Sequence, residues 1–413
     1  MDMDYEIYHD SGDINGIINL PSSKSISNRA LLIQALSYSP YPVLNLSDSD
    51  DTKALQQVFT SNSNIFDIGH AGTTMRFLTA FLSRVVGEWV LTGSSRMKQR
   101  PIGILVDALR KLGAKIEYIE NEGYPPLKIL GSHLKGGLLE MDGSVSSQYI
   151  SALLMIGPLV DGGLTIHLVN KIASRSYIDM TLKLMAYFGI SYEWKGNKIH
   201  IPQQDYSPME YDVEGDWSGT SYWYQMLALA KSGKVELLNL KIPGLQGDSI
   251  VAEWFLDFGI SSMQTSKSIV ISKISDRKPK FLQLDFIENP DIAQTMAVLC
   301  VLKEVPFHFR GLETLKIKET DRIAALQNEL AKFGAALKEP AHGELSWDGS
   351  FTLPIEKKPE ILTYHDHRMA MAFAPAALIG KVIIRDPHVV TKSYPSFFDD
   401  MKKVGFTIRQ FDV

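Results

Sequence analysis

The chain has 413 residues, of which 45% are apolar and 22% are charged, with 30 glycines and 19 prolines. These values are typical of a globular protein and exclude a disordered chain, a collagen and a coiled coil. At roughly 150 residues per domain, the length predicts two or three domains. No apolar run reaches the roughly 18 residues that a transmembrane helix needs, so we expect no membrane partner.

The net charge and the cysteine content exclude further classes of protein. The 42 Lys and Arg residues against 47 Asp and Glu residues give a net charge of −5, which argues against a nucleic-acid partner. The single cysteine, Cys300, excludes an internal disulfide framework and a cysteine-rich metal site. The first ten residues, MDMDYEIYHD, are acidic and lack the features of a signal peptide. We therefore expect a cytoplasmic protein.

Six segments are apolar on nearly every side, which predicts helices that are buried all round. Their starts are 45, 75, 72, 71 and 76 residues apart along the chain. In chain order they are Ala30–Leu36, Met75–Leu82, Ile150–Val160, Tyr222–Ala230, Ala293–Leu302 and Met369–Ile379.

Amphipathic segments alternate with these buried ones. Five of them end in a glycine that is the expected left-handed helix stop, at Gly113, Gly189, Gly259, Gly334 and Gly405. Runs that favour a strand follow, such as AKIEYI, ISYEW, AALKE and FTIRQ. The segment DDTKALQQVF resembles a sixth member that has lost its glycine and much of the following hairpin.

The pattern predicts one repeated unit, made of a buried helix, an exposed helix and several short strands, about 73 residues long and used six times. Six such units divide into two domains of three, in an α/β (α+β) fold. The chemistry is expected where polar residues interrupt this pattern.

Cations gather just before or at the start of the buried helices. A helix N-terminus carries a partial positive charge, so a cation there costs roughly 0.3–1 kcal/mol unless an anion compensates. Ser, Thr and Asp at such places are ordinary caps, but caps do not require Lys24, Arg29, Arg76 or Arg368. These four positions therefore indicate bound anions.

Further basic stretches precede the amphipathic helices, in MKQRP, SRSY, KIKETDR and TKSYP. Arg matches carboxylate and phosphate oxygens with a planar fork, and Lys supplies a point charge. The expected substrates are small molecules that carry phosphates and carboxylates. The chain has no GxxxxGK[ST] motif, so an ATP-binding version of this idea has no support.

Two acids, Asp291 and Glu319, lie among these cations. Each has an ordinary alternative, a helix cap for Asp291 and a surface ion pair for Glu319. A carboxylate near cations can also act as a general base, and one with a raised pKa can act as a general acid. The pair His365 and His367 could suggest a metal, but no cysteine or second histidine cluster lies near them, so metal is the weaker interpretation.

The motifs together resemble the 5-enolpyruvylshikimate-3-phosphate synthases of the enolpyruvyl transferase family. The segments LPSSKSISNRALL, GHAGTTMR, LTGSSRMKQRPIG, DGSVSSQYISALLM, IKETDR, YHDHRMAMAF and TKSYPSFF occur in that family's order, as do LSDSDDT, LVDALRKLGA, YPPL, SYID, VEGD and LQGD. They extend from residue 20 to residue 398, so the resemblance covers essentially the whole chain.

The resemblance implies the enolpyruvyl transferase fold, with two domains of three βαβαββ units each. By position, the chain would cross between the domains near Pro21 and Gly215, giving one domain of residues 1–21 and 215–413 and an inserted domain of residues 22–214. The implied reaction transfers the enolpyruvyl group of phosphoenolpyruvate to the 5-hydroxyl of shikimate 3-phosphate, in the shikimate pathway. The family is a glyphosate target, needs no metal or cofactor, and suggests a monomer.

Roles for individual residues also follow from the resemblance. Asp291 would deprotonate the 5-hydroxyl, Glu319 would protonate the methylene carbon, and Lys24 would stabilise the charge that develops. The implied contacts to shikimate 3-phosphate involve Lys24, Ser25, Arg29, Ser146, Ser147, Gln148, Ser174, Tyr177, Asp291 and Lys318. Those to phosphoenolpyruvate involve Lys24, Gly72, Arg100, Gln148, Arg322, Arg368 and Lys392.

Some positions depart from the family pattern. His70, Phe77 and Thr314 replace the usual Asn, Pro and Asn, and SRSY replaces the frequent SKPY. The chain is also short between Asp51 and Arg76, as expected for a trimmed first unit. Two alternatives are an enolpyruvyl transferase acting on UDP-N-acetylglucosamine, whose loop cysteine has no counterpart here, and a non-catalytic anion-binding protein, which would have no use for the two acids.

Overall fold

The computed structural model describes residues 3–242, 244–266 and 268–412. The chain forms two compact units, which we call unit 1 (Met1–Ser22 and Glu214–Val413) and unit 2 (Ser23–Val213). The crossings predicted near Pro21 and Gly215 lie within one residue of these limits. That each unit is an independently folding domain stays a prediction.

One pattern of strands recurs in both units. Two parallel strands are joined by a buried helix, and where the pattern is complete an exposed helix then leads into an antiparallel hairpin that joins the same sheet. In unit 2 the clearest case is β8 (Lys135–Asp142), α5 (Ser147–Ile156), β9 (Asp161–Val169) and α6 (Arg175–Tyr187), followed by β10 (Glu193–Lys195) and β11 (Lys198–Ile201). This is the βαβαββ unit that the resemblance implied, and it contains the buried helix, the exposed helix and the short strands that the periodicity predicted.

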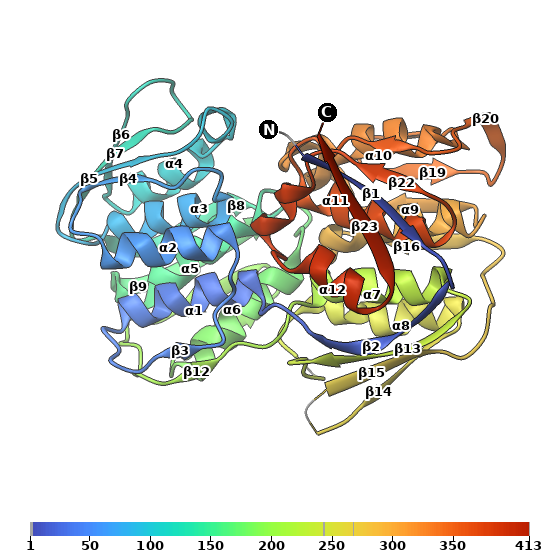
Figure 1. The fold of residues 1–413 in the computed structure, drawn as a ribbon. Helices are drawn as coiled ribbons and strands as arrows, with labels where there is room; N and C mark the ends of the chain where they lie inside the picture. The colour runs from blue at the N-terminus through green and yellow to red at the C-terminus, as the bar shows by residue number, and fades with distance from the viewer. Residues whose placement is uncertain (1–2, 243, 267, 413) are drawn as a thin grey trace. The chain divides into compact units, whose positions relative to one another are not determined.

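The other strands and helices of unit 2 follow the same plan (Figure 1). One repeat pairs β4 (Ile65–Asp67) with β5 (Gly87–Thr92) around α3 (Gly72–Leu82), and then adds α4 (Gly103–Lys111), β6 (Lys115–Tyr118) and β7 (Leu127–Gly131). The predicted trimmed repeat contains α1 (Lys24–Leu36), α2 (Asp50–Thr60) and one parallel pair, β3 (Val43–Leu44) with β12 (Tyr211–Asp212). Among the described residues no hairpin follows α2, whereas the sequence predicted the loss of much of it.

Unit 1 contains the other three repeats. The first has β2 (Asp13–Asn19), α7 (Trp217–Leu229), β13 (Ser232–Leu238), α8 (Val251–Trp254), β14 (Ile260–Gln264) and β15 (Ser268–Lys273). The second has β16 (Leu282–Asp285), α9 (Ala293–Leu302), β17 (Phe307–Arg310), α10 (Arg322–Ala331), β18 (Phe333–Ala335), β19 (Leu345–Trp347) and β20 (Phe351–Ile355). The last has β21 (Glu360–Ile361), α11 (His367–Phe373), β22 (Val382–Ile384), α12 (Phe397–Lys403) and β23 (Phe406–Asp412), and β1 (Met3–His9) completes its sheet.

Short 3-10 helices connect several of these elements. In unit 2 they are η1 (Met97–Gln99) and η2 (Gly157–Leu159). In unit 1 they are η3 (Gly247–Ile250), η4 (Phe255–Phe258), η5 (Pro290–Ile292), η6 (Glu313–Ile317), η7 (Ala374–Leu378) and η8 (Pro387–Lys392). None of the helices in the described part of the chain combines the length and the apolar character that a membrane span requires.

The buried helices form the centre of each unit. In α9 every residue from Ala293 to Val301 is buried, and α9 contacts both α7 and α11. In unit 2, α3 contacts both α1 and α5. Cys300, in the segment Ala293–Leu302 that was predicted to be buried, is fully buried in the core of unit 1, and burial raises the pKa of its thiol well above the ordinary value.

The predicted glycine stops are confirmed, because all five glycines have φ between 74° and 102°. Two strand predictions are wrong in part. The run ISYEW begins at Ile190, but β10 begins only at Glu193, because the backbone of Ile190 still bonds back to Met185 in the helix. Of AALKE only Ala335 belongs to β18, whose pairing with β20 shifts register there.

Candidate active site

In unit 1, predicted site residues come together at the starts of three helices. Asp291 lies in η5, just before α9, and Arg322 is the first residue of α10, where Asp321 accepts the N–H groups of Ile323 and Ala324. Arg368 lies in the first turn of α11, which is capped by Asp366. The caps anchor the first turns, and these turns present the charged side chains.

Arg322 is the hub of this cluster. Its side chain is 1% exposed, and its guanidinium donates to three carboxylates. Nε and Nη2 bond Asp366 at 2.7 and 3.3 Å, Nη1 bonds Asp291 Oδ1 at 3.2 Å, and Nη2 bonds Glu319 Oε2 at 2.9 Å. These bonds use four of the five N–H donors of a guanidinium. Burial opposes the charge, but the three carboxylates outweigh it and raise the pKa of Arg322.

Two further cations face Asp291. Arg368 Nη2 lies 3.0 Å from Asp291 Oδ2, and its Nη1 donates to the backbone carbonyl of the same residue at 3.0 Å. Lys318 Nζ lies 3.7 Å from Asp291 Oδ1. Burial lowers the pKa of Lys318, against the opposing influence of Asp291. The Asp291 carboxylate is therefore held by three cations, which favour its ionised form.

The ordinary alternatives for the two acids do not describe this geometry. The cap position of η5 belongs to Asn289, and Asp291 lies inside the turn with its side chain directed at the cations. Glu319 does form an ion pair, but its partner Arg322 is buried, so this is not a surface pair. The structure thus joins Asp291 and Glu319 to neighbouring nitrogens of one guanidinium.

Three more residues with predicted or possible roles, Lys392, His365 and His367, belong to unit 1. The two histidine rings differ in exposure. Lys392 Nζ donates to the backbone carbonyl of His365. The His365 ring is 87% exposed, whereas that of His367 is 2% exposed. Among the described residues, no group of three or more His, Cys, Asp or Glu side chains could hold a metal ion.

In unit 2, predicted residues gather at the first turns of four helices. Arg29 of α1 donates to Thr181 Oγ1 of α6 at 2.7 Å and to Ser151 Oγ of α5 at 3.0 Å. Its Nη1 also donates to the carbonyl of Ser25 at 2.8 Å. These contacts join the second turns of α1 and α5 to the middle of α6. Lys24 and Ser25 lie one turn before Arg29, at the start of α1.

The start of α3 adds two arginines to this cluster. The side chain of Gln148, in α5, donates to Thr73 Oγ1 at 3.2 Å, which links the first turns of α3 and α5. Arg76 donates to the carbonyl of Gly72 at 3.0 Å. Arg100 lies directly against Gly72, where a Cβ would come 2.5 Å from Arg100 Nη1. A glycine is therefore needed for this close approach.

The serines assigned to a phosphate also lie at helix starts. Ser146 caps α5 through its Oγ, which accepts the N–H of Gln148, and Ser147 is the first residue of that helix. Ser174 precedes α6 with φ of 54°, a strained value for a residue other than glycine, and Tyr177 lies in that helix's first turn. Helix N-termini favour anions, so the placement suits a phosphate.

Four cations of this unit 2 cluster differ from the cations of the unit 1 cluster in their partners. Among the ion pairs of the described residues, none involves Lys24, Arg29, Arg76 or Arg100. Burial lowers the pKa of Arg29 and of Arg76 to about 10, and for Arg76 the charge of Arg100 adds to the effect. Buried cations that form no ion pair attract anions.

Three polar residues of the unit 1 cluster carried no predicted role. Asp366 bonds Arg322 and caps α11. Asn289 lies two residues before Asp291 in the sequence. Asp248 lies close to Asp291 in the fold and is joined to Asn289 by a hydrogen bond of 3.1 Å. Asp366 and Asp248 belong to motifs noted in the sequence, YHDHR and LQGD, but their partners are distant along the chain. No pattern of spacing could have identified these pairs.

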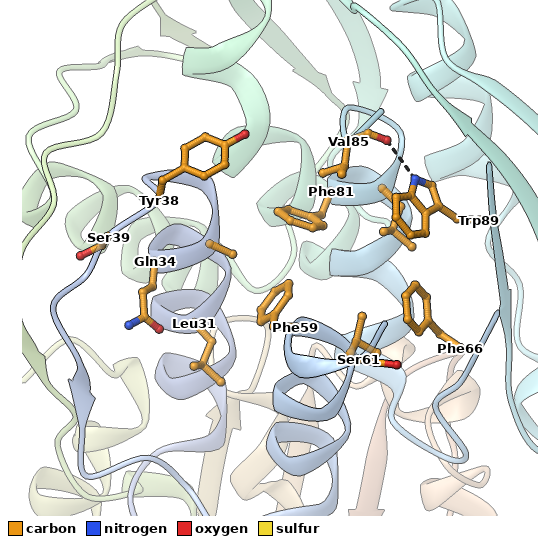
Figure 2. Close-up of a pocket in the computed structure, with 13 residues that line it drawn as sticks. Leu31, Gln34, Tyr38, Ser39, Phe59, Ser61, Phe66, Phe81, Val85 and Trp89 are labelled. Atoms are coloured by element: carbon orange, nitrogen blue, oxygen red, sulfur yellow. Dashed lines mark hydrogen bonds between the residues drawn. The ribbon is translucent and has the colours of Figure 1, made fainter. Parts of the chain in front are cut away.

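Unit 2 also contains an apolar cavity of about 410 Å³ between α1, α2 and α3. Figure 2 shows Phe59, Phe81, Phe66 and Trp89 along its wall. No charged side chain of the described residues lines it. It is therefore unsuited to substrates that carry phosphates, and it is separate from the cluster at the helix starts.

Comparison with known proteins identifies the family. Residues 9–61 and 53–401 match the family model described as EPSP synthase (3-phosphoshikimate 1-carboxyvinyltransferase). A 3-phosphoshikimate 1-carboxyvinyltransferase of Bacteroides fragilis is 50% identical over 398 residues, covering 96% of this chain and 97% of that protein. One of Aliivibrio salmonicida is 39% identical over 425 residues, covering 95% and 97%.

Solved structures agree with the fold. The EPSP synthase of Acinetobacter baumannii superposes with a TM-score of 0.79 at 22% identity, over 99% of this chain and 100% of that one. The enolpyruvyl transferase NikO of Streptomyces tendae gives a TM-score of 0.76 at 15% identity, over 100% and 99%. At these identities the likeness concerns the fold alone, while the family model and the curated relatives concern the whole sequence. The chain therefore belongs to the EPSP synthase (3-phosphoshikimate 1-carboxyvinyltransferase) family.

Proposed function

We propose that the two charged clusters bind the substrates of this family's reaction and carry out its proton transfers. The chain is a 3-phosphoshikimate 1-carboxyvinyltransferase. It transfers the enolpyruvyl group of phosphoenolpyruvate to the 5-hydroxyl of shikimate 3-phosphate and releases phosphate. Addition of the hydroxyl oxygen to C2, with a proton to C3, gives a tetrahedral adduct, and loss of one proton of the new methyl group and of phosphate restores the double bond.

The observation that carries the assignment is the sharing of Arg322 by two acids. Asp291 and Glu319 bond adjacent nitrogens of one buried guanidinium, so a proton acceptor and a proton donor lie side by side. Addition requires a proton to leave the hydroxyl and another to reach C3. Asp291, held ionised by three cations, is the base for the hydroxyl, and Glu319 is the acid for C3.

The carboxylate of phosphoenolpyruvate is assigned to Arg322 and Arg368. Both guanidiniums hold Asp291 in the described structure, and Arg322 also holds Glu319. A substrate carboxylate that takes over some of these donors weakens the hold on both acids. Binding of the donor substrate therefore frees the two groups that must exchange protons.

Unit 2 is assigned the remaining anionic groups. The shikimate 3-phosphate phosphate is placed at Ser146, Ser147 and Ser174, its carboxylate at Ser25 and Arg29, and its ring along Tyr177. The phosphoenolpyruvate phosphate is placed at Lys24, Gly72, Arg100 and Gln148. The support is that the cations of this cluster have no acid partner among the ion pairs of the described residues.

The partners and location are proposed in the same way. The enzyme acts on two small anionic substrates as a cytoplasmic monomer, with no nucleic-acid or membrane partner. No metal or cofactor is assigned a part, because side chains provide every proton transfer and every charge that the reaction needs.

Glu319→Gln tests the acid role. The variant keeps the shape of the side chain but removes its transferable proton, so turnover should fall by roughly 10²–10⁴-fold while the affinity for shikimate 3-phosphate changes little. Glu313→Gln, at an exposed glutamate of the same unit, is the matched control. Near-normal turnover in Glu319→Gln, with normal uptake of solvent deuterium into the product methylene, would assign the proton to another group, with Lys24 the next candidate.

Asp291→Asn tests the base. Turnover should fall by a similar factor, and binding of shikimate 3-phosphate should also weaken because an acceptor for a ring hydroxyl is lost.

The identity of the acceptor is tested with the unmodified enzyme. Phosphate release is measured with shikimate 3-phosphate and separately with UDP-N-acetylglucosamine as the acceptor. Turnover with only the second acceptor would contradict the proposed substrate.

A further inference from the structure

Asp248 is a buried acid of unit 1 that the proposed mechanism leaves unused. It lies in η3, its side chain is 3% exposed, and among the described residues it forms no ion pair. Its two hydrogen bonds go to other elements. Oδ2 accepts from Ser218 Oγ of α7 at 2.5 Å, and Oδ1 accepts from Asn289 Nδ2 at 3.1 Å. Since neither donor is a backbone N–H of its own helix, Asp248 is not a cap.

One of these bonds reaches the turn that carries Asp291. Asn289 is 7% exposed and occupies the cap position of η5, two residues before Asp291. Its backbone carbonyl accepts the N–H of Ile292 at 3.3 Å, which closes that turn. The other bond reaches Ser218 at the start of α7, a helix joined to α9 by the contact of 2.9 Å between Ser221 and Thr295. Asp248 therefore ties the turn to the buried helices.

The charge of Asp248 also acts on Asp291. Burial raises the pKa of Asp248 to about 6, the negative charge of Asp291 adds to the rise, and Ser218, Asn289 and Arg368 oppose it. Repulsion between two carboxylates is mutual, so charge on Asp248 makes charge on Asp291 less favourable by the same amount. This matters because Lys318, Arg322 and Arg368 together would make Asp291 a weak proton acceptor.

We propose that Asp248 is a positioning residue for the reaction: it fixes the turn of Asp291 through Asn289, and its negative charge maintains the basicity of Asp291. The charged groups facing Asp248 are Asp291 of η5 and Arg368 of α11. The proposal depends on the assignment of Asp291 as the base.

Asp248→Asn separates charge from shape. The new amide can accept from Ser218 and donate to Asn289 once that side-chain amide flips, so both hydrogen bonds survive. We expect kcat to fall by about 10-fold or more, as for other outer partners of reacting groups, with little change in KM for either substrate. The acidic limb of the pH profile of kcat/KM should move to lower pH, because Asp291 becomes a weaker base. Phosphate ionisations of the substrates are common to both proteins and cancel.

Asp400→Asn is the matched control, since Asp400 is a buried acid of the same unit whose partners Ser396, Lys403 and Tyr394 lie outside the cluster. It should keep the pH profile of the unmodified enzyme. If Asp248→Asn also keeps both kcat and the acidic limb, the proposal is overturned while the role of Asp291 stands. If Asp291→Asn retains turnover, the proposed function fails and this inference fails with it.

Asn289→Ala provides a second variant in case Asp248→Asn does not fold. It cuts the link to the turn but leaves both carboxylates in place. We expect a lower kcat with little change in KM. Unchanged kcat in a folded Asn289→Ala protein would overturn the positioning role.

Discussion

A buried carboxyl destabilises a protein when it ionises, and Asp248 ionises within the working range of pH. Its pKa rises from 3.8 to about 6 in the folded protein, mainly through burial. Between these two values the native state binds more protons than the unfolded state, so stability falls as the pH rises. Above pH 6 the full cost, about 3 kcal/mol, is present. Below the unfolded value it vanishes.

Asp248→Asn should therefore stabilise the enzyme at pH 8 and have little effect near pH 4. Thermal unfolding of both proteins at the two pH values measures the difference. Asp400→Asn, which removes an acceptor from Lys403 and Ser396, should give no gain at pH 8. A gain that is equal at both pH values would mean that packing, and not charge, limits stability at Asp248.

Gly72→Ala should displace Arg100. The added Cβ would lie 2.5 Å from Nη1 and 3.0 Å from Cζ, so the guanidinium must move, and a flexible side-chain end can do so without unfolding the chain. Loss of one charged hydrogen bond to the donor phosphate should raise KM for phosphoenolpyruvate by about 10-fold or more. Inhibition by glyphosate should weaken as well.

Steady-state kinetics with each substrate varied would test the effect of Gly72→Ala. Gly103→Ala is the control, because its Cβ would meet no atom closer than 3.4 Å. Unchanged KM in Gly72→Ala would remove Arg100 from the donor site.

At the scale of elements, the glycine stops depend on backbone conformation alone. Gly113 ends α4 with φ of 96°, and a Cβ there would have no atom within 4 Å. Gly113→Ala should therefore cost about 1–2 kcal/mol through the left-handed backbone and not through a clash. Gly380→Ala has equal space without the unusual φ and should be nearly neutral. Urea unfolding of both variants measures the costs, and equal values would contradict this explanation.

The helices could be predicted because their signals are local. Apolar residues on every side of α9 and a glycine after α10 are visible in a single stretch of sequence. The short strands were harder to predict from the sequence. β18 has three residues and pairs with β20, about twenty residues further on, so the pairing partner and not the sequence of β18 determines where it lies.

The site was also predictable only in part, because its residues have local signals but their contacts depend on the fold. Motifs indicated Asp291, Glu319, Arg322 and Arg368 one by one, but the joining of three carboxylates by Arg322 depends on helix starts that the fold brings together. Asp366 and Asp248 escaped notice because an acid beside a helix start is usually a cap. The roles of all these residues stay predictions until the variants are measured.

For the whole molecule, the contrast between the clusters predicts selective stabilisation by anions. Arg29 and Arg76 are buried and form no ion pair among those of the described residues. Inorganic phosphate at about 100 times its dissociation constant should add about 2.7 kcal/mol to the stability of the part that binds it. Calorimetry should show the rise in the transition of unit 2, and sodium chloride at equal ionic strength should not reproduce it. Equal shifts with both salts would contradict a specific site.

The pairing of β2 with β13 has a consequence for synthesis on the ribosome. These two strands are neighbours in the sheet, but in the sequence the whole of unit 2 comes between them. The strand β1 pairs with β22 and β23, which come near the other end of the sequence. At roughly 5–20 residues per second, β1 waits roughly 20–80 s for its partners, whereas unit 2 has all its strands once residue 213 has emerged. Unit 2 can thus fold before β1, because β1 remains unpaired until β22 and β23 have emerged.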